Sequence, residues 1–222
     1  MVSRAPADSD TATRVLDIAS RLVQTRGFNG FSYADIAAEL QVTKASLHYH
    51  FPTKAELGRR LIERYEARFL AALAAIDGEA GGAADKLRRY VRIYAAVLGE
   101  RQMCLCGMLA AEHGTLPEAM RVGLKHYFDA NERWLARVLD SGRMSGDLHF
   151  EGKPQAVASL LVGALEGAMM LARSYGDARR FDAAAERLLA DLRVPLPAPR
   201  KRRAAGARTA PRAATRPARP AR

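Results

Sequence analysis

The 222-residue sequence has very little of several features that define whole classes of protein. Its two cysteines, Cys104 and Cys106, cannot build a disulfide framework and lie too close along the chain to bond each other well. No apolar run reaches the ~18 residues that a membrane span needs. Residues 1–10 lack the charged start and apolar core of a signal peptide. We therefore expect a protein of the reducing cytoplasm with no membrane partner.

Proline and strand signals are scarce before residue 195. Only four of the ten prolines lie there (Pro6, Pro52, Pro117 and Pro154), and the stretches between them are rich in Ala, Leu, Arg and Glu. Sustained alternating patterns and Asn-Gly hairpins are absent. This composition favours helices, so we predict an all-α fold.

Acidic residues are missing from the end of the chain. The formal net charge is +11, but residues 195–222 hold nine of the 35 basic residues and none of the 24 acids. The first 194 residues therefore carry a net charge of only +2. The Ala/Pro/Arg segment has too little apolar surface to fold, so we predict disorder. It either solubilises the protein or attracts DNA phosphates without reading base sequence.

Apolar periodicity and capping residues predict nine helices. Their ranges are 11–26, 32–40, 43–51, 54–76, 85–100, 103–113, 117–139, 154–175 and 182–192. A turn is expected at residues 141–146. We divide the chain into a disordered arm (1–10), a DNA-binding domain (11–53), a larger helical domain (54–194) and a disordered basic tail (195–222).

The third predicted helix has more polar capacity than a packing helix needs. Leu47 and Phe51 provide its apolar anchor, and only Ala45 and Leu47 interrupt the run of hydrogen-bonding side chains. Those side chains are Thr43, Lys44, Ser46, His48, Tyr49 and His50. From the N-terminal end of a helix in the major groove, such groups reach base edges and phosphates. Together with the short turn before it, this helix indicates a helix-turn-helix DNA-binding unit.

Residues 19–57, "ASRLVQTRGFNGFSYADIAAELQVTKASLHYHFPTKAEL", resemble the TetR family of bacterial transcriptional regulators. The resemblance rests on Gly27-Phe28, Ile36-Ala37, Val42-Thr43-Lys44 and the string "LHYHFPTK". It implies an N-terminal helix-turn-helix domain followed by a ligand-binding and dimerisation domain.

The resemblance also implies a role for each matching position. The positions expected to face bases or nearby phosphates are those of Thr43, Lys44, Ser46 and His48, with Ala45 among them where the family usually has glycine. Tyr49, His50 and Lys54 fall at phosphate-binding positions, and Ser32 and Tyr33 at the start of a helix that abuts the DNA backbone. His48 replaces a common tyrosine, which we expect to alter base preference. An alternative for Tyr49 and His50 is that they cover the hinge between domains.

The larger domain is less distinctive. Residues 156–172 are apolar nearly all round, which predicts burial on all sides and, in a domain of this size, against a second copy. Phe181, Leu188, Leu189 and Leu192 could join that seam, so we expect a homodimer through the last two helices. A two-fold dimer would suit a palindromic operator.

Aromatic and methionine side chains suggest an effector pocket in the same domain. The wider set is Tyr90, Tyr94, Met103, Met108, His113, Tyr127, Phe128, Trp134, Met169 and Met170, and the favoured lining is Tyr94, Cys104, Met108, His113, Phe128, Trp134, Glu166 and Met170. For each, ordinary core packing is the alternative. Glu166 is either a ligand contact or the partner of a neighbouring arginine.

The cysteines admit two interpretations. A helix N-terminus lowers a thiol pKa, so Cys104 or Cys106 could sense electrophiles or oxidants, as some members of the resembled family do. The alternative is that both are small buried hydrophobes. Cysteine and histidine spacing gives no metal site, and no cofactor is expected.

We therefore predict a DNA-binding transcriptional regulator, a repressor released from a palindromic operator by a small molecule, with an electrophile as one option. An enzyme is disfavoured because glycine-rich phosphate loops, nucleophile elbows and paired carboxylates are absent. An architectural protein that coats DNA is the remaining rival, because of the basic tail.

Overall fold

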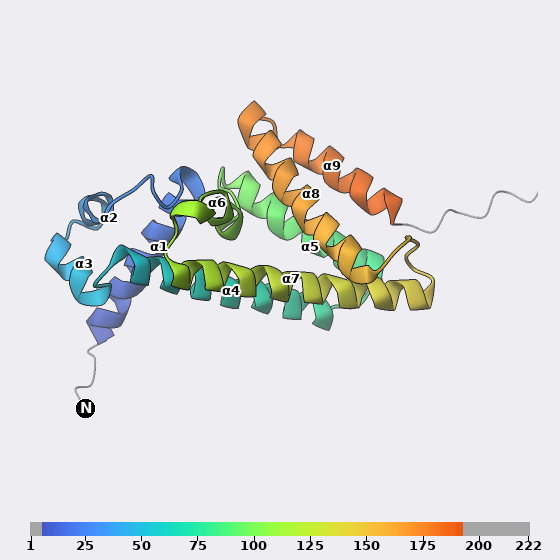
Figure 1. The fold of residues 1–222 in the computed structure, drawn as a ribbon, viewed down its shortest axis with the longest axis horizontal. Coiled ribbons are helices and arrows are strands. Elements are labelled where there is room, and N and C mark those ends of the chain that lie inside the picture. The colour runs from blue at the N-terminus through green and yellow to red at the C-terminus, as the bar shows by residue number, and fades with distance from the viewer. Residues whose placement is uncertain (1–5, 193–222) are drawn as a thin grey trace, which may run out of the picture.

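The computed structural model describes residues 6–192, side chains from residue 10 onward, and this part is helical throughout (Figure 1). The helices are α1 (Pro6–Arg26), α2 (Tyr33–Leu40), α3 (Lys44–His50), α4 (Lys54–Gly78), α5 (Ala83–Gly99), α6 (Leu105–Ala111), the 3₁₀ turn η1 (His113–Thr115), α7 (Glu118–Ser145), α8 (Pro154–Tyr175) and α9 (Arg179–Asp191). The predicted all-α class is confirmed. The basic tail lies outside the described residues.

Side-chain caps set the boundaries of the small N-terminal helices. Ser32 and Asp35 form a reciprocal capping box at the start of α2. Thr43 Oγ1 accepts the Ser46 N–H at the start of α3, and Thr53 caps α4 in the same way. Between α2 and α3, Gln41 takes a left-handed conformation with φ of 56° and closes α2. These local bonds make the tight turn that the sequence predicted.

The helices form an elongated molecule with α1, α2 and α3 at one end (Figure 1). The long helices α4 and α7 pack against each other, α8 packs on α7, and α9 packs on α8. Helix α6 contacts α1, α4 and α7. It therefore joins the small domain to the body.

Three predicted boundaries differ from the structure by three or more residues. Helix α1 begins at Pro6, so residues 6–10 are helical rather than part of a disordered arm. Proline suits the first helical position because a backbone N–H there would have no hydrogen-bond partner within the helix. Helix α9 begins at Arg179 instead of residue 182. Helix α7 continues through the expected turn to Ser145, because Gly142 is a packing residue whose added Cβ would lie 2.5 Å from Leu148 Cδ1.

Helix α8 is buried on one face only within the single chain, so the expected burial of its other face against a second copy stays a prediction. One face, with Leu161, Leu165 and Met169, is buried in the body, whereas Leu160 and Leu171 remain 63% and 58% exposed. By length and hydropathy α8 also qualifies as a candidate membrane span, against the expectation that no run is long enough. Since a core helix passes the same test and α8 packs on α7 and α9, this is weak evidence for a span.

Candidate DNA-reading helix and effector cavity

Helix α3 presents its polar side chains to solvent. Leu47 is fully buried and Phe51 nearly so, and they fasten the helix to the small domain. The exposed residues are Thr43, Lys44, Ala45, His48 and Tyr49, with Ser46 and His50 half-buried. Tyr49 is 66% exposed although it is aromatic. A seven-residue helix with this distribution offers hydrogen bonds and one apolar ring to an outside partner.

His48 is held in a defined orientation. Its ring packs on Tyr33 with centroids 4.7 Å apart, and Nδ1 lies 3.1 Å from the Pro52 carbonyl oxygen. A carbonyl oxygen can only accept, so Nδ1 carries the hydrogen of this bond. Nε2 is then the ring nitrogen left for an outside partner, and in neutral imidazole it is an acceptor. This differs from a tyrosine hydroxyl, which also donates.

Two residues expected at the DNA surface make hydrogen bonds within the protein. Tyr33 is buried, and its hydroxyl donates to the Phe51 carbonyl at 2.7 Å. Burial, with a smaller contribution from Glu56, raises the pKa of Tyr33 to about 12. Lys54 Nζ donates to the carbonyls of Phe28 and Phe31, and burial lowers the pKa of its ammonium group. These roles depend on contacts 18 to 26 residues away along the chain, which spacing does not reveal.

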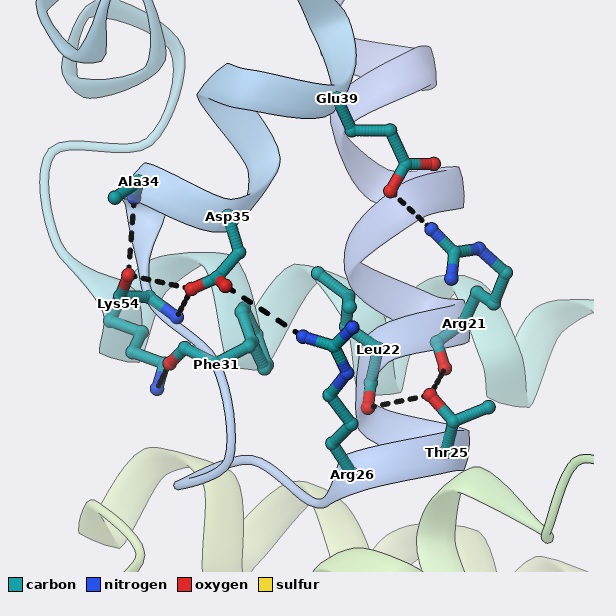
Figure 2. Close-up of polar contacts among 10 residues, drawn as sticks. Arg21, Leu22, Thr25, Arg26, Phe31, Ala34, Asp35, Glu39 and Lys54 are labelled. Carbon is teal, nitrogen blue, oxygen red and sulfur yellow. Dashed lines mark hydrogen bonds and ion pairs between the residues drawn. The ribbon is translucent and has the colours of Figure 1, made fainter.

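Ion pairs fix α2 against α1 (Figure 2). Arg21 pairs with Glu39, and Arg26 lies 3.7 Å from Asp35. Ser32, expected beside the DNA backbone, is exposed at the N-terminus of α2, where its hydroxyl donates to Asp35 at 2.7 Å. These contacts join α2 to α1, and both helices pack against α3.

A buried polar network lies in the middle of the body. Asn131 is fully buried; its Oδ1 accepts from the Tyr90 hydroxyl at 3.0 Å, and its Nδ2 donates to the Tyr94 oxygen at 3.2 Å. The Tyr90 ring stacks on Trp134 with centroids 5.6 Å apart. Phe69 and Tyr127 extend the aromatic cluster.

Beside this network lies a very small cavity. Its free volume is about 10 Å³, close to the room one water molecule requires. It is lined by Tyr65, Phe69, Ile93, Tyr94, Val97, Cys104, Tyr127 and Met169. Because established ligand pockets hold roughly 300–1,000 Å³, a ligand larger than water could enter only if the lining moved.

Glu166 and Cys104 meet at the edge of this cavity. Burial raises the pKa of Glu166 to about 6, while hydrogen bonding with Cys104 opposes the rise. Glu166 Oε1 is buried and has no hydrogen-bond partner in the described part of the chain. A Cβ on Gly107 would lie 2.2 Å from Glu166 Oε2, so this glycine lets α8 approach α6. Among the described residues no arginine pairs with Glu166, and a ligand contact stays a prediction.

Burial favours the second interpretation of the cysteines, as small buried hydrophobes, over an activated thiolate. Cys104 and Cys106 are both buried, and burial raises the pKa of each thiol well above its ordinary value. Cys104 is the N-cap residue of α6, and its Sγ accepts the Gly107 N–H at 3.4 Å. Desolvation outweighs the favourable field of the short helix.

The predicted pocket residues do not form one site. Tyr94 and Cys104 line the cavity, and Glu166 lies beside Cys104. Trp134 instead lines a separate groove with Asp77, to which its Nε1 donates at 2.9 Å. His113 and Phe128 line a third groove on the surface. Met108 is half-buried against the core, and Met170 is 55% exposed on the outer face of α8.

Sequence reasoning missed several lining residues. The sequence pattern singles out neither the cavity residues Tyr65, Phe69, Ile93 and Val97 nor Asn131 of the polar network. Tyr65 and Phe69 lie on the apolar stripe of α4, where a tyrosine hydroxyl among aliphatic neighbours was the available signal. Among the described residues no cluster of three or more His, Cys, Asp and Glu side chains could hold a metal ion.

A helix-turn-helix unit with an exposed polar third helix, joined to a helical body with an internal cavity, defines a DNA-binding transcriptional regulator rather than an enzyme. Two family descriptions match the chain: bacterial regulatory proteins of the tetR family over residues 15–61, and the tetracyclin repressor-like C-terminal domain over residues 69–188. The chain therefore belongs to the TetR family, as the sequence resemblance indicated.

Relatives and solved structures agree with this assignment. The chain is 29% identical to the transcriptional regulator AcuR of Cereibacter sphaeroides over 67% of its own length and 69% of that protein. It is 23% identical to the transcriptional repressor DhaR of a Mycobacterium species, over 65% and 73%. A TetR-family regulator from Agrobacterium tumefaciens superposes with a TM-score of 0.82 at 30% identity, over 84% of this chain and all of the other.

Proposed function

We propose that the protein is a homodimeric repressor that binds a palindromic operator in the cytoplasm and releases it when a small molecule enters the body. The observation that carries the proposal is α3, whose polar residues face outward around a buried Leu47 anchor. Thr43, Lys44, Ser46 and His48 would contact bases or nearby phosphates, and Tyr49 and His50 would contact phosphates. Lys54 and Tyr33 would act indirectly, by holding α3 in place.

The outer face of α8 supports dimerisation. Leu160, Met170 and Leu171 are more than half exposed, and a Cβ on Gly163 or Gly167 would meet no atom within 4 Å. An apolar face of this kind on a folded body is typical of a protein–protein contact. A second copy related by a two-fold axis would cover it and place two α3 helices on one face of the DNA.

The cavity supports an effector site. Tyr94 and Cys104 line it among aromatic and aliphatic side chains, and the Glu166 carboxyl group lies beside Cys104. A small molecule with a hydrogen-bond donor would satisfy Glu166 Oε1, and its entry would displace the side chains around it. Because both thiols are buried and protonated, we favour reversible binding over capture of an electrophile.

The electrophile alternative keeps one supporting observation, that Cys104 lines the cavity. It is tested by Cys104→Ser: operator release by electrophiles that persists in this variant removes the alternative.

The operator itself is sought by selecting duplexes from a random pool and measuring their binding in gel shifts. Enrichment of one palindrome bound by a dimer supports the proposal, and uniform binding to every duplex supports the rival coating role. In Leu160→Arg, we expect a monomer by analytical ultracentrifugation and loss of palindrome binding. The control is Glu118→Gln on the exposed start of α7. A dimeric Leu160→Arg protein contradicts the proposed interface.

A further inference from the structure

The segment from Gln24 to Asn29 covers the end of α1 and the start of the loop to α2, and several body residues hold it. Met103 exchanges two hydrogen bonds with Gln24, and Thr115 accepts one from the Asn29 side chain at 2.8 Å. Two further body residues bind the backbone of the segment. Glu112, the residue that ends α6, accepts the Phe28 N–H at 2.7 Å and the Asn29 N–H at 3.3 Å. Arg173, near the end of α8, donates to the Gln24 carbonyl at 3.0 Å and the Thr25 carbonyl at 2.5 Å. Both body residues therefore contact backbone atoms of the same short segment.

The chain conformation at this segment is built for the contact with Glu112. Gly27 has φ of +82°, a conformation that favours glycine, and a Cβ there would lie 2.6 Å from Glu112 Oε1. On the same loop Lys54 holds the carbonyls of Phe28 and Phe31. The loop thus has its N–H groups bound by an anion from α6 and its carbonyls bound by a cation from α4.

Glu112 and Arg173 lie on two helices whose other ends reach the cavity region. Cys104, which lines the cavity, caps the start of α6, and Glu166 of α8 lies beside it. Cys104 and Glu112 flank α6, which at 1.5 Å per residue separates them by about 12 Å. Glu166 and Arg173 are seven residues apart on α8 and so lie on nearly the same face, two turns apart. At Gly107 the Glu166 carboxylate fits against α6 with no room for a side chain. A displacement at the cavity would therefore act on both helices that hold the segment.

We propose that Glu112 and Arg173 form a clasp on residues 24–29 and are positioning residues that set how the reading helix is held relative to the body. The inference deepens the proposed function, because it names the residues that would transmit an effector's entry to α3. Glu112 contributes most, since it is half-buried and binds two amides, whereas Arg173 is exposed to solvent.

The test measures position directly. Nitroxide labels are placed at Ala38→Cys on α2 and Asp129→Cys on α7, both exposed, in the full chain. The native thiols are buried and should not take label. Labelled chains are diluted in an excess of unlabelled chains. Pulsed electron paramagnetic resonance then reports the distance between the two labels of one chain, whether or not the protein dimerises.

We expect one narrow distance distribution in the parent and at least a twofold broadening in Glu112→Ala. Glu112→Gln, which keeps one acceptor oxygen, should fall between them. The matched control Glu118→Gln, which loses only an exposed ion pair with Arg121, should stay narrow. Unchanged distributions in both Glu112 variants overturn the inference. If Glu112→Ala does not fold, as judged by circular dichroism, Glu112→Gln and Arg173→Ala decide the outcome in its place.

A second measurement separates this inference from the function on which it rests. Affinity for the selected duplex should fall at least fivefold in Glu112→Ala and stay within twofold in Glu118→Gln. If the parent selects no duplex, the proposed function fails while the distance measurement still decides the clasp. Broadened distances with unchanged duplex affinity would show that the clasp does not set the reading helix, and would also overturn the inference.

Discussion

Replacing Glu166 by glutamine should stabilise the protein at neutral and alkaline pH, which is unusual for a buried position. Burial places the pKa of Glu166 at about 6 instead of the ordinary 4.5. The folded state therefore binds its proton more tightly than the unfolded chain does, so stability rises as pH falls from about 6 towards 4.5. Above pH 6 the buried carboxylate destabilises the fold in full.

The size of the effect follows from the two pKa values. One pKa unit corresponds to about 1.4 kcal/mol, so the ionised carboxylate costs about 2 kcal/mol above pH 6. Glutamine has nearly the same shape but no charge. In Glu166→Gln we expect the free energy of unfolding to rise by about 1–2 kcal/mol at pH 8. At pH 4.5, where the native carboxyl is protonated, the gain should vanish.

The assay is urea unfolding followed by circular dichroism at pH 4.5, 6, 7 and 8. Protein concentration is kept fixed, because the stability of a dimer depends on it. Glu118→Gln serves as the exposed control and should change stability little at any pH. A Glu166→Gln protein that is less stable than the parent at pH 8, or a stability difference independent of pH, would refute the reasoning.

Three further predictions follow from other sites. Asn131→Ala should cost about 2–4 kcal/mol of unfolding free energy in urea, because it strands the Tyr90 and Tyr94 hydroxyls in the core; a cost below 1 kcal/mol contradicts this. Cys104 and Cys106 should react with a thiol reagent in the native protein at the unfolding-limited rate, and rapid labelling would disprove their protection. Deleting residues 195–222 should weaken duplex binding and flatten its salt dependence but keep operator preference, so an unchanged salt slope counts against a DNA role for the tail.

The sequence alone was sufficient wherever the cause is local. Ser32, Thr43 and Thr53 cap their helices through atoms two to three residues away, so the start of each helix could be predicted. The buried anchor Leu47 and the exposed polar residues of α3 follow from helical periodicity. The outward-facing polar residues of α3 and the all-α class were therefore predictable from the sequence.

Only the tertiary structure decided what depends on distant partners. Lys54 reads as a surface cation, yet it binds carbonyls 23 and 26 residues away, and Glu112 binds amides more than 80 residues away. Gly142 reads as a turn residue, yet it packs inside α7 against Leu148. The helix N-terminus beside Cys104 favours a thiolate, but burial, which no local pattern states, raises its pKa instead. Local hydrogen bonds select the helices, whereas burial and charge at the site arise only when segments far apart in sequence pack together.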